Sequence, residues 1–408
     1  MLNMAVIVAA LGYFVDVYDL ILFSVVRVPS LRELGIPEKE FLGIGMYPFH
    51  AQMIGMLLGG VLWGVYGDKK GRLSVLFGSI ILYSIANILN GFVHDIETYS
   101  LLRFLAGVGL AGELGAGITL VSEILPKAQR GYGTTIVATV GVLGALFASA
   151  MAELFTWRVC FIIGGVAGLA LLVLRIKVSE SSLFHKGHKS SHVKRGDLGM
   201  LLGNPTRLGR YIRCILVGTP VWFALGIFMQ FAPEFGKSIG LVDADGHSIV
   251  TGAKAVFYAY IGLTLGDLFS GIISQVLRSR RKALFLFISI TALSAVTFLV
   301  MLPQIKTPQG IYTLLIPIGF GAGYWAVFIT TSAEQFGTNL RATVTTSVPN
   351  FVRGAAVPIT WAFKEILPHV GGLVNAAYAV GAVVMCLSFA ALATLKESYH
   401  TDLDFVEA

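Results

Sequence analysis

The chain has 408 residues, of which 55% are hydrophobic and only 13% are charged, and its mean hydropathy is +0.78. An ordinary soluble domain carries about 25% charged residues, so this composition excludes a typical water-soluble protein and favours a membrane protein. The net charge of +7 does not indicate nucleic-acid binding, because Lys and Arg gather in turns between apolar runs and form no basic face.

Apolar runs follow one another along the whole chain, each near the ~20 residues that a bilayer-spanning helix needs. They predict an all-α membrane protein with twelve transmembrane helices, at 4–28, 42–66, 73–93, 98–125, 131–153, 157–175, 211–235, 251–277, 283–302, 310–333, 344–367 and 370–395. The polar, basic stretch 176–210 predicts a cytoplasmic linker. It would join an N-terminal six-helix bundle, 1–175, to a C-terminal bundle, 211–408, that ends in a short acidic tail.

The charges of the loops predict the orientation of these helices. Most Lys and Arg residues lie in the linker and in the loops that follow even-numbered helices, among them Lys69, Lys70, Arg72, Lys127, Arg130, Arg278, Arg280, Arg281, Lys282 and Arg341. Short loops rich in Lys and Arg stay in the cytoplasm. We therefore expect a multi-pass protein of the cell (inner) membrane with both termini cytoplasmic.

The loop between the second and third apolar runs carries the most specific motif. Residues 64–72 read Gly-Val-Tyr-Gly-Asp-Lys-Lys-Gly-Arg, and their polar part, 67–72, predicts a tight turn at the membrane surface. The pattern Gly-x-x-Gly-Asp-x-x-Gly-Arg resembles the signature loop of the major facilitator superfamily; a generic turn with cytoplasmic charges is the alternative. The resemblance implies secondary transport by alternating access, on a fold of two pseudo-symmetric six-helix bundles.

The two halves of the sequence repeat. Glu334 stands 211 positions after Glu123, and Arg341 stands 211 positions after Arg130. A near-constant offset indicates two parallel halves, with substrate bound near the membrane midplane between them. The family resemblance implies a conformational latch of Gly64, Gly67, Asp68, Arg72, Glu123 and Arg130, with Glu334 and Arg341 as its C-terminal counterpart; solvated pairs at helix ends are the alternative.

Asp16 and Asp19 lie three residues apart in the first apolar run, and so on one helix face. A charge at the centre of a lipid-facing helix costs about 2.5–3.5 kcal/mol, so such groups usually face a cavity. The sequence Phe-Val-Asp-Val-Tyr-Asp-Leu at 14–20 resembles the first helix of proton-coupled sugar, phosphate and organic-acid symporters. The resemblance implies that Asp19 carries the coupled proton, with Asp16 as a further candidate; a structural ion pair is the alternative for each.

Two charges in the fourth apolar run extend this resemblance. Arg103, followed by Phe-Leu-Ala-Gly-Val-Gly, resembles the residue that pairs with the first-helix Asp in related symporters; anchoring an outer loop is its alternative role. Glu113 resembles the acidic residue of the Gly-Gly-Glu/Asp segment in phosphate and organic-acid symporters, and would share in proton coupling. Leu114 replaces the Tyr of the phosphate symporters, and Gly226 stands where they have an Asp, so phosphate is disfavoured.

The C-terminal half offers candidates for substrate binding. Arg353 and Asn350 lie three apart in the eleventh run, and the planar guanidinium of Arg353 suits a carboxylate. Asp267 in the eighth run is a second candidate or a structural partner of Arg353. The remaining aromatic and amide candidates for the cavity wall are Gln230, Trp222 and Tyr324, although aromatic residues in membrane helices more often serve packing or interface anchoring.

No nucleotide-binding, Rossmann, nucleophile-elbow or zinc motif is present, and the three cysteines, Cys160, Cys214 and Cys386, show no paired spacing. We therefore expect no cofactor, no metal site and no enzyme activity. The sequence predicts a monomeric secondary transporter in the lipid bilayer that moves a small organic acid or other polar metabolite together with protons. The alternatives are a proton-driven exporter of drugs or metabolites and a non-transporting receptor on the same fold.

Overall fold

The computed structural model describes residues 4–70, 72–113, 130–182, 199, 201 and 203–399. Every named element among these residues is a helix, and their one β pairing is an isolated bridge between Val242 and Ser248. The all-helical fold class expected from the sequence is therefore found. Glu123 lies outside the described residues, as does most of the second half of the predicted helix 98–125.

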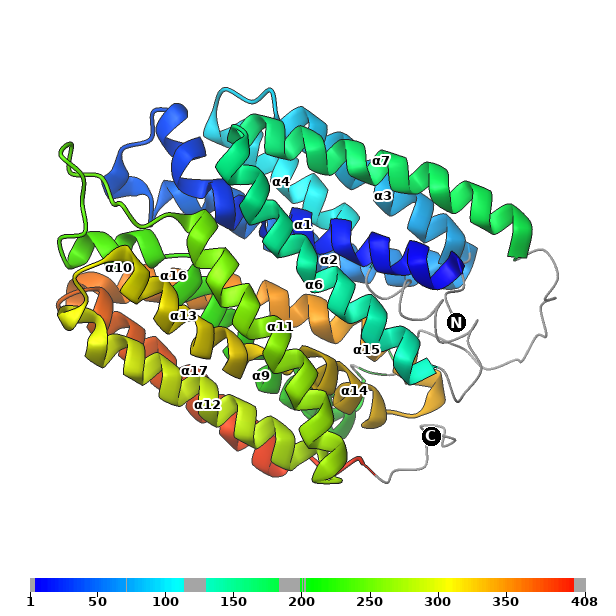
Figure 1. Ribbon diagram of the computed structural model, residues 1–408. Coiled ribbons are helices and arrows are strands. Elements are labelled where there is room, and N and C mark those ends of the chain that lie inside the picture. The colour runs from blue at the N-terminus through cyan, green and yellow to red at the C-terminus, as the bar shows by residue number, and fades with distance from the viewer. Residues whose placement is uncertain are drawn as a thin grey trace. The chain divides into compact units, whose positions relative to one another are not determined.

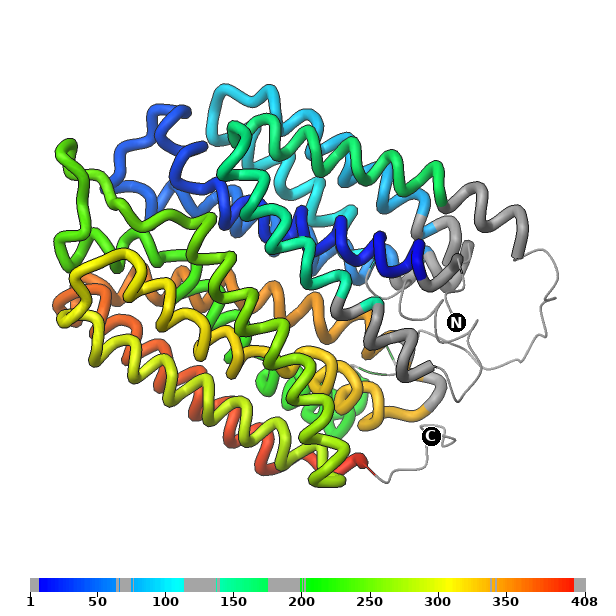
Figure 2. The backbone as a smooth tube through the Cα atoms, in the orientation of Figure 1, coloured from blue at the N-terminus to red at the C-terminus, as the bar shows by residue number. Residues whose placement is uncertain are grey.

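The chain forms two compact units, and the first contains Met1–Phe23 with Tyr47–Leu198. Its helices are α1 (Met4–Glu33), α2 (Tyr47–Lys70), α3 (Arg72–Asn90), α4 (Ile96–Leu110), α6 (Arg130–Leu154) and α7 (Trp157–Ser182). Only the first two thirds of α1 belong to this unit. α1 continues as one helix into the second unit, as the tube in Figure 2 shows.

The second unit contains Ser24–Met46 with Gly199–Ala408. Its elements beyond α1 are the 3-10 turns Glu38–Glu40 and Ile44–Met46, then α9 (Pro205–Phe223), the π-helical segment η3 (Ala224–Met229), α10 (Ala232–Ser238), α11 (Gly252–Val276), α12 (Arg280–Met301), η4 (Leu302–Gln304), α13 (Pro308–Ala322), α14 (Trp325–Glu334), α15 (Thr338–Gly354), α16 (Ala356–Val370) and α17 (Leu373–Thr394). Figure 1 labels the main helices of both units.

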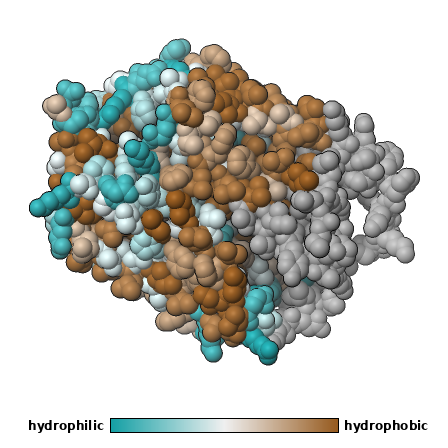
Figure 3. All heavy atoms as spheres, viewed as in Figure 1, coloured by the Kyte–Doolittle hydropathy of each residue, from teal (hydrophilic) through white to brown (hydrophobic). Residues whose placement is uncertain are grey.

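Seven helical segments within the described residues are long and apolar enough to cross a membrane: Ile7–Glu33, Trp157–Leu174, Pro205–Met229, Gly252–Val276, Arg280–Gln304, Pro308–Glu334 and Leu373–Thr394. The sequence-based count of twelve spans remains a prediction. Hydrophobic residues cover much of the visible surface, and hydrophilic residues gather mainly toward the left edge of the view (Figure 3). Large apolar side chains such as Leu293 and Val276 are 69% and 75% exposed, which suits a surface solvated by lipid.

The prediction of a polar turn over residues 67–72 is wrong for most of these residues. α2 continues through Lys70 and α3 begins at Arg72, so only one position separates the two helices. Charged side chains at the membrane surface reach water from a helical backbone as well as from a turn, so their presence does not end the helix. The seventh predicted span, 211–235, likewise begins earlier than expected: α9 starts at Pro205, where the Asn204 side chain accepts hydrogen bonds from the amides of Thr206 and Arg207.

Three of the predicted helices are interrupted in the second unit. α9 gives way to the π-helical η3 after Pro220, which has no N–H to donate to Leu216; the hydroxyl of Thr219 bonds that carbonyl instead, at 2.7 Å. The tenth predicted helix divides into α13 and α14 at residues 323–324. The eleventh divides into α15 and α16 at Ala355, where Pro358 removes the amide that would continue the α-helical ladder.

Several helix pairs touch backbone to backbone through glycine, and two of them, one in each unit, form glycine seams: α2 with α4 and α11 with α13. In the first unit, a Cβ on Gly55 of α2 would lie 2.2 Å from the carbonyl oxygen of Phe104 in α4. In the second, a Cβ on Gly262 of α11 would lie 2.0 Å from the carbonyl oxygen of Ile316 in α13. No real side chain fits at such distances, so glycine is required at both crossings. The further glycines of these two seams are Gly59, Gly107, Gly266, Gly319 and Gly323.

Candidate functional site

The carboxylate of Asp19 is completely buried in the first unit, where α1 packs against α7. Gly164 of α7 makes room for it, because a Cβ at that position would lie 2.3 Å from Asp19 Oδ1. The amide of Gln52 on α2 donates to the backbone oxygens of Asp19 and Leu20 at 3.4 and 3.3 Å. The hydroxyl of Tyr18 donates to the carbonyl oxygen of Cys160 at 2.8 Å, which holds this stretch of α1 against α7.

Arg103 of α4 is also completely buried and acts on Asp19 electrostatically. Its Nη2 donates to Asn87 Oδ1 on α3, and the Asn87 side chain lies within interaction range of the Asp19 carboxylate. The guanidinium also lies over the ring of Phe161, 4.6 Å from its centroid. Three fully buried polar side chains from α1, α3 and α4 thus form one connected group. Sequence reasoning paired Asp19 with Arg103 but missed Asn87, which carries no charge and stands in an apolar run.

The other acidic candidates of the first unit occupy separate positions. Asp16 is 8% exposed and lies about one helical turn before Asp19 on α1. Glu113, just beyond α4, is buried and accepts a hydrogen bond from the hydroxyl of Ser79 on α3 at 2.9 Å. Both carboxylates are therefore withdrawn from solvent, as expected of groups that serve a transport path or a buried network.

The second unit contains a helix break next to an acidic side chain. α13 ends at Ala322 and α14 begins at Trp325, with Gly323 packed so closely on α11 that a Cβ would lie 2.6 Å from the amide nitrogen of Asp267. Asp267 Oδ1 accepts a hydrogen bond from the amide of Ala326 at 3.3 Å. The carboxylate thus caps the start of α14, where backbone amides lack helical partners. Broken membrane helices commonly mark binding sites.

Arg353 lies near the same break, because its guanidinium is 5.6 Å from the ring centroid of Trp325. It is 4% exposed, and its Nη1 donates to Asn350 Oδ1 one turn earlier at 3.2 Å. Tyr324 is buried at the break itself, and its hydroxyl donates to the carbonyl oxygen of Val217 in α9 at 2.9 Å. The structure therefore gathers Arg353, Asn350, Tyr324 and Trp325 around the break that Asp267 caps.

The two remaining candidates of this half, Trp222 and Gln230, lie along the seventh predicted span, 211–235. Trp222 is buried in α9. Gln230 follows η3, and its side chain contacts Met46 Sδ at 3.9 Å while its backbone oxygen accepts a hydrogen bond from Arg27 at 3.0 Å. Its contacts are thus with α1 and with the loop that follows α1.

The latch residues are only partly described. Gly64, Gly67 and Asp68 lie in α2, Arg72 begins α3 and Arg130 begins α6, but the structure describes only the backbone of these residues, and Glu123 lies outside the described residues. In the second unit Glu334 forms an ion pair with Arg280 at 3.1 Å and accepts from the hydroxyl of Ser398 at 2.7 Å. Arg341 donates to the carbonyl oxygens of Ala333 and Phe336, both at 3.3 Å. The sequence analysis counted Arg280 only among the charges of the loops, but in the structure Arg280 is the ion-pair partner of Glu334.

A family model matches residues 9–360, and its description is Major Facilitator Superfamily. The chain belongs to the major facilitator superfamily. The resemblance seen in the loop at 64–72 is therefore confirmed over most of the chain. Membership identifies an integral membrane transporter rather than an enzyme.

Several curated proteins similar to this chain are named as bacterial transporters. A niacin transporter of Acinetobacter baylyi is 26% identical over 82% of this chain and 80% of its own length. A gentisate transporter of Corynebacterium glutamicum is 23% identical over 97% of this chain and 88% of its own length. A benzoate transport protein of Acinetobacter baylyi is 31% identical over a shorter stretch, 43% of this chain and 39% of its own length.

Proposed function

We propose that this superfamily member moves a small organic acid across the membrane by alternating access, together with a proton, and that aromatic monocarboxylates are its preferred cargo. Niacin, gentisate and benzoate, which name three similar transporters, are each a carboxylate on a six-membered aromatic ring. The observation that carries the proposal is the pairing of a buried arginine with an indole ring at a helix break, Arg353 with Trp325.

Arg353 and Trp325 match the two parts of such a substrate. A guanidinium offers parallel N–H donors to both oxygens of a carboxylate, and an indole ring offers a flat apolar face to an aromatic ring. Asn350 orients Arg353 through the hydrogen bond to Nη1. Tyr324 and Asp267 would hold the break in shape, the first through Val217 and the second through the start of α14.

Asp19 is proposed as the group that binds the transported proton. A fully buried carboxylate is costly when it is charged and unpaired, so it must be protonated or balanced by a nearby cation. Arg103 supplies that cation. Asn87 connects Arg103 with Asp19, because its side-chain oxygen accepts a hydrogen bond from Arg103 and its side chain also lies next to the Asp19 carboxylate. A movement of Arg103 or Asn87 would change how well the charge of Asp19 is compensated, and would allow Asp19 to take up or release a proton. Asp16 and Glu113 are the next proton-binding candidates.

Transport by purified protein in proteoliposomes tests this proposal. Labelled benzoate, nicotinate and gentisate are offered under an imposed inward pH gradient and again after a protonophore collapses it. We expect accumulation of at least one of them with the gradient and only equilibration without it. Movement of substrate out of the vesicles, driven by protons moving in, would instead favour an exporter. Saturable binding with no flux would favour a receptor.

The recognition step is tested by replacing Arg353 with Lys, which keeps the charge but loses the fork of donors. Loss of a charged hydrogen bond of about 1.5–3 kcal/mol should raise the KM for the transported acid at least about tenfold. Arg158→Lys is the matched control, since Arg158 also lies over an indole, 4.3 Å from the Trp157 centroid, at the start of α7 in the first unit. An unchanged KM in Arg353→Ala would remove Arg353 from the binding site.

A further inference from the structure

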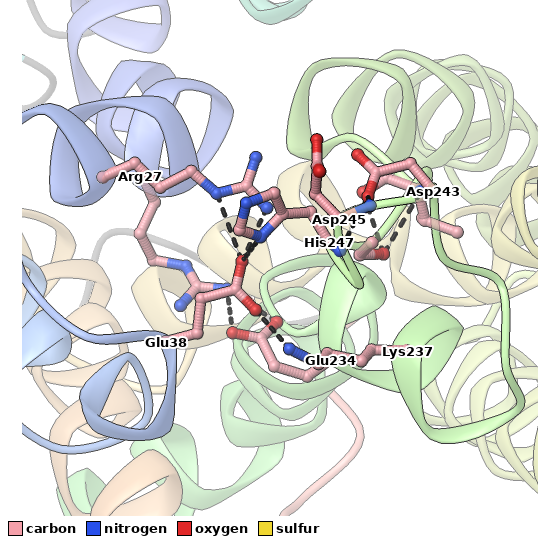
Figure 4. Close-up of polar contacts among 10 residues, drawn as sticks. Arg27, Glu38, Glu234, Lys237, Asp243, Asp245 and His247 are labelled. Carbon is pink, nitrogen blue, oxygen red and sulfur yellow. Dashed lines mark hydrogen bonds and ion pairs between the residues drawn. The ribbon is translucent and has the colours of Figure 1, made fainter.

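The loop that follows α1 is joined to the segment around α10 by charged side chains from parts of the chain about 200 residues apart. This loop comes early in the sequence, yet Ser24–Met46 packs within the second unit. Figure 4 shows Arg27 and Glu38 from the α1 segment facing Glu234, Lys237 and His247 from the α10 segment. Neither family membership nor the substrate proposal assigns these residues a role.

The inner part of this contact is a buried ion pair. Arg27 Nη2 donates to both carboxylate oxygens of Glu234, at 2.6 and 2.7 Å, and Arg27 is 1% exposed. The guanidinium also lies over the ring of Phe231, 5.5 Å from its centroid. α11 approaches the same stretch of α1, because a Cβ on Gly252 would lie 2.8 Å from the carbonyl oxygen of Ser24. The outer end of α1 is therefore firmly held by α10 and α11.

The outer part of the contact converges on the carboxylate of Glu38. Arg32 of α1 donates to Glu38 Oε1 at 2.7 Å, Lys237 of α10 donates to Oε2, and His247 Nδ1 lies 2.7 Å from Oε1. Burial alone would raise the pKa of Glu38, but the hydrogen bonds from Lys237, Arg32 and His247 outweigh it and lower the pKa to about 2. Glu38 therefore remains ionised at every physiological pH.

His247 is placed by a self-contained turn before α11. Its backbone amide donates to Asp243 Oδ1 at 2.8 Å, its carbonyl accepts from the Asp243 amide at 2.8 Å, and Gly246 supplies the positive φ of +78° that the turn needs. The charged groups around its ring are Glu38 and Arg32 from the α1 segment, Lys237 from α10, and Asp243 and Asp245 from its own turn. Histidine is the side chain type whose charge commonly changes between pH 5 and 8.

We propose that Glu38, Arg32, Lys237 and His247 form a pH-dependent clasp that holds the loop after α1 against the turn before α11. When His247 is protonated, Glu38 faces three cations and the clasp is tight. When His247 is neutral, one charged interaction becomes a neutral hydrogen bond and the clasp loosens. Under the orientation predicted from loop charges this end faces the outside, so external acidity would favour its closed form.

Hydrogen–deuterium exchange on the whole protein in nanodiscs tests the clasp without any substrate. Exchange in residues 34–46 and 239–251 is compared at pH 5.5 and 7.5, after correction for the intrinsic pH dependence of amide exchange. We expect protection in both segments to be about two- to fivefold greater at pH 5.5, the range for an exposed ion pair. His247→Gln should abolish that difference, and His247→Lys should keep high protection at both values.

His369→Gln is the matched control, since His369 is another exposed histidine of the same unit, at the end of α16. It should retain the wild-type difference. An equal pH response in wild type and His247→Gln would overturn the proposal, as would a response confined to one of the two segments. Because no transported molecule is involved, failure here is distinct from failure of the substrate proposal.

Discussion

The buried pair between Arg27 and Glu234 allows a quantitative prediction. Glu234→Ala would leave the guanidinium of Arg27, which is 1% exposed, without its carboxylate. Breaking a buried ion pair costs about 3–5 kcal/mol. Arg27 would keep its hydrogen bond to the carbonyl oxygen of Gln230 and its position over Phe231, and Glu234 is itself 15% exposed, so water can enter. We therefore expect the lower end of the range, about 3 kcal/mol.

A double-mutant cycle measures this interaction. Unfolding in mixed micelles of increasing denaturing detergent, followed by circular dichroism, gives the free energy for wild type, Glu234→Ala, Arg27→Met and the double variant. The double variant removes both charges and should recover most of the loss, leaving a cost of about 1 kcal/mol or less. Lys364 and Glu365 provide a matched control, since they are 2.8 Å apart but 45% and 49% exposed. Glu365→Ala should cost under about 1 kcal/mol.

Two outcomes of the cycle would refute this reasoning. A cost for Glu234→Ala no greater than that for Glu365→Ala would mean that burial does not strengthen the pair. Simple addition of the two single costs in the double variant would mean that Arg27 and Glu234 act independently.

Three further predictions concern transport and pH. Asp19→Asn, a permanently neutral mimic, should abolish accumulation under a pH gradient yet allow counterflow exchange; accumulation at the wild-type level would move the proton site elsewhere. Gly164→Ala places a Cβ 2.3 Å from Asp19 Oδ1 and should lower accumulation at least about tenfold, whereas Gly271→Ala, with no neighbouring atom within 4 Å, should transport normally in the same assay. Because the pKa of Glu38 falls from 4.5 to about 2 on folding, its ionised form stabilises the protein above pH 4.5, and this contribution is lost as pH falls from 4.5 toward 2. Thermal unfolding at pH 6 and pH 3 should show a larger drop in Tm for wild type than for Glu38→Gln, and equal drops would contradict the role of Glu38.

Helix positions were predictable where a long apolar run follows a capping residue. The span predicted at 251–277 corresponds to α11, Gly252–Val276, and the span at 283–302 corresponds to α12, Arg280–Met301. Both begin at capping residues, Thr251 and Ser279, whose hydroxyls accept amide hydrogen bonds three residues later. The motif at 64–72 likewise identified the family, because it combines charge, glycine spacing and position between two apolar runs.

The interruption at residues 323–324 was not predictable from hydropathy, because apolar residues continue on both sides of it. The break at Ala355 is marked in the sequence by Pro358, which hydropathy does not register. What ends α13 is tertiary packing, in which Gly323 contacts the backbone of α11 and Asp267 supplies a new cap for α14. Hydropathy measures the environment of a segment and is insensitive to the path of its backbone.

The side-chain groups were predictable only in part. Charge marked Asp19, Arg103, Asp267 and Arg353 as unusual in apolar surroundings, since isolated charges there are costly. Asn87 has no such signal, and its role depends on α3 lying between α1 and α4. The partners Glu38 and His247 lie in polar loops, where charge is ordinary, and 209 positions separate them. Only the folded chain shows that they meet.

The glycine seams also constrain the order in which the helices can assemble during synthesis. Each seam joins helices that are not consecutive, α2 with α4 and α11 with α13, and a third helix lies between them in the sequence. Neither seam can close until the later helix has left the ribosome and entered the bilayer. Until then the bare backbone around Gly55 and around Gly262 has no partner. The seam of each unit can therefore form only after its later helix, α4 or α13, has entered the bilayer. A nascent chain truncated before α4 or before α13 should remain loosely associated and open to membrane proteases.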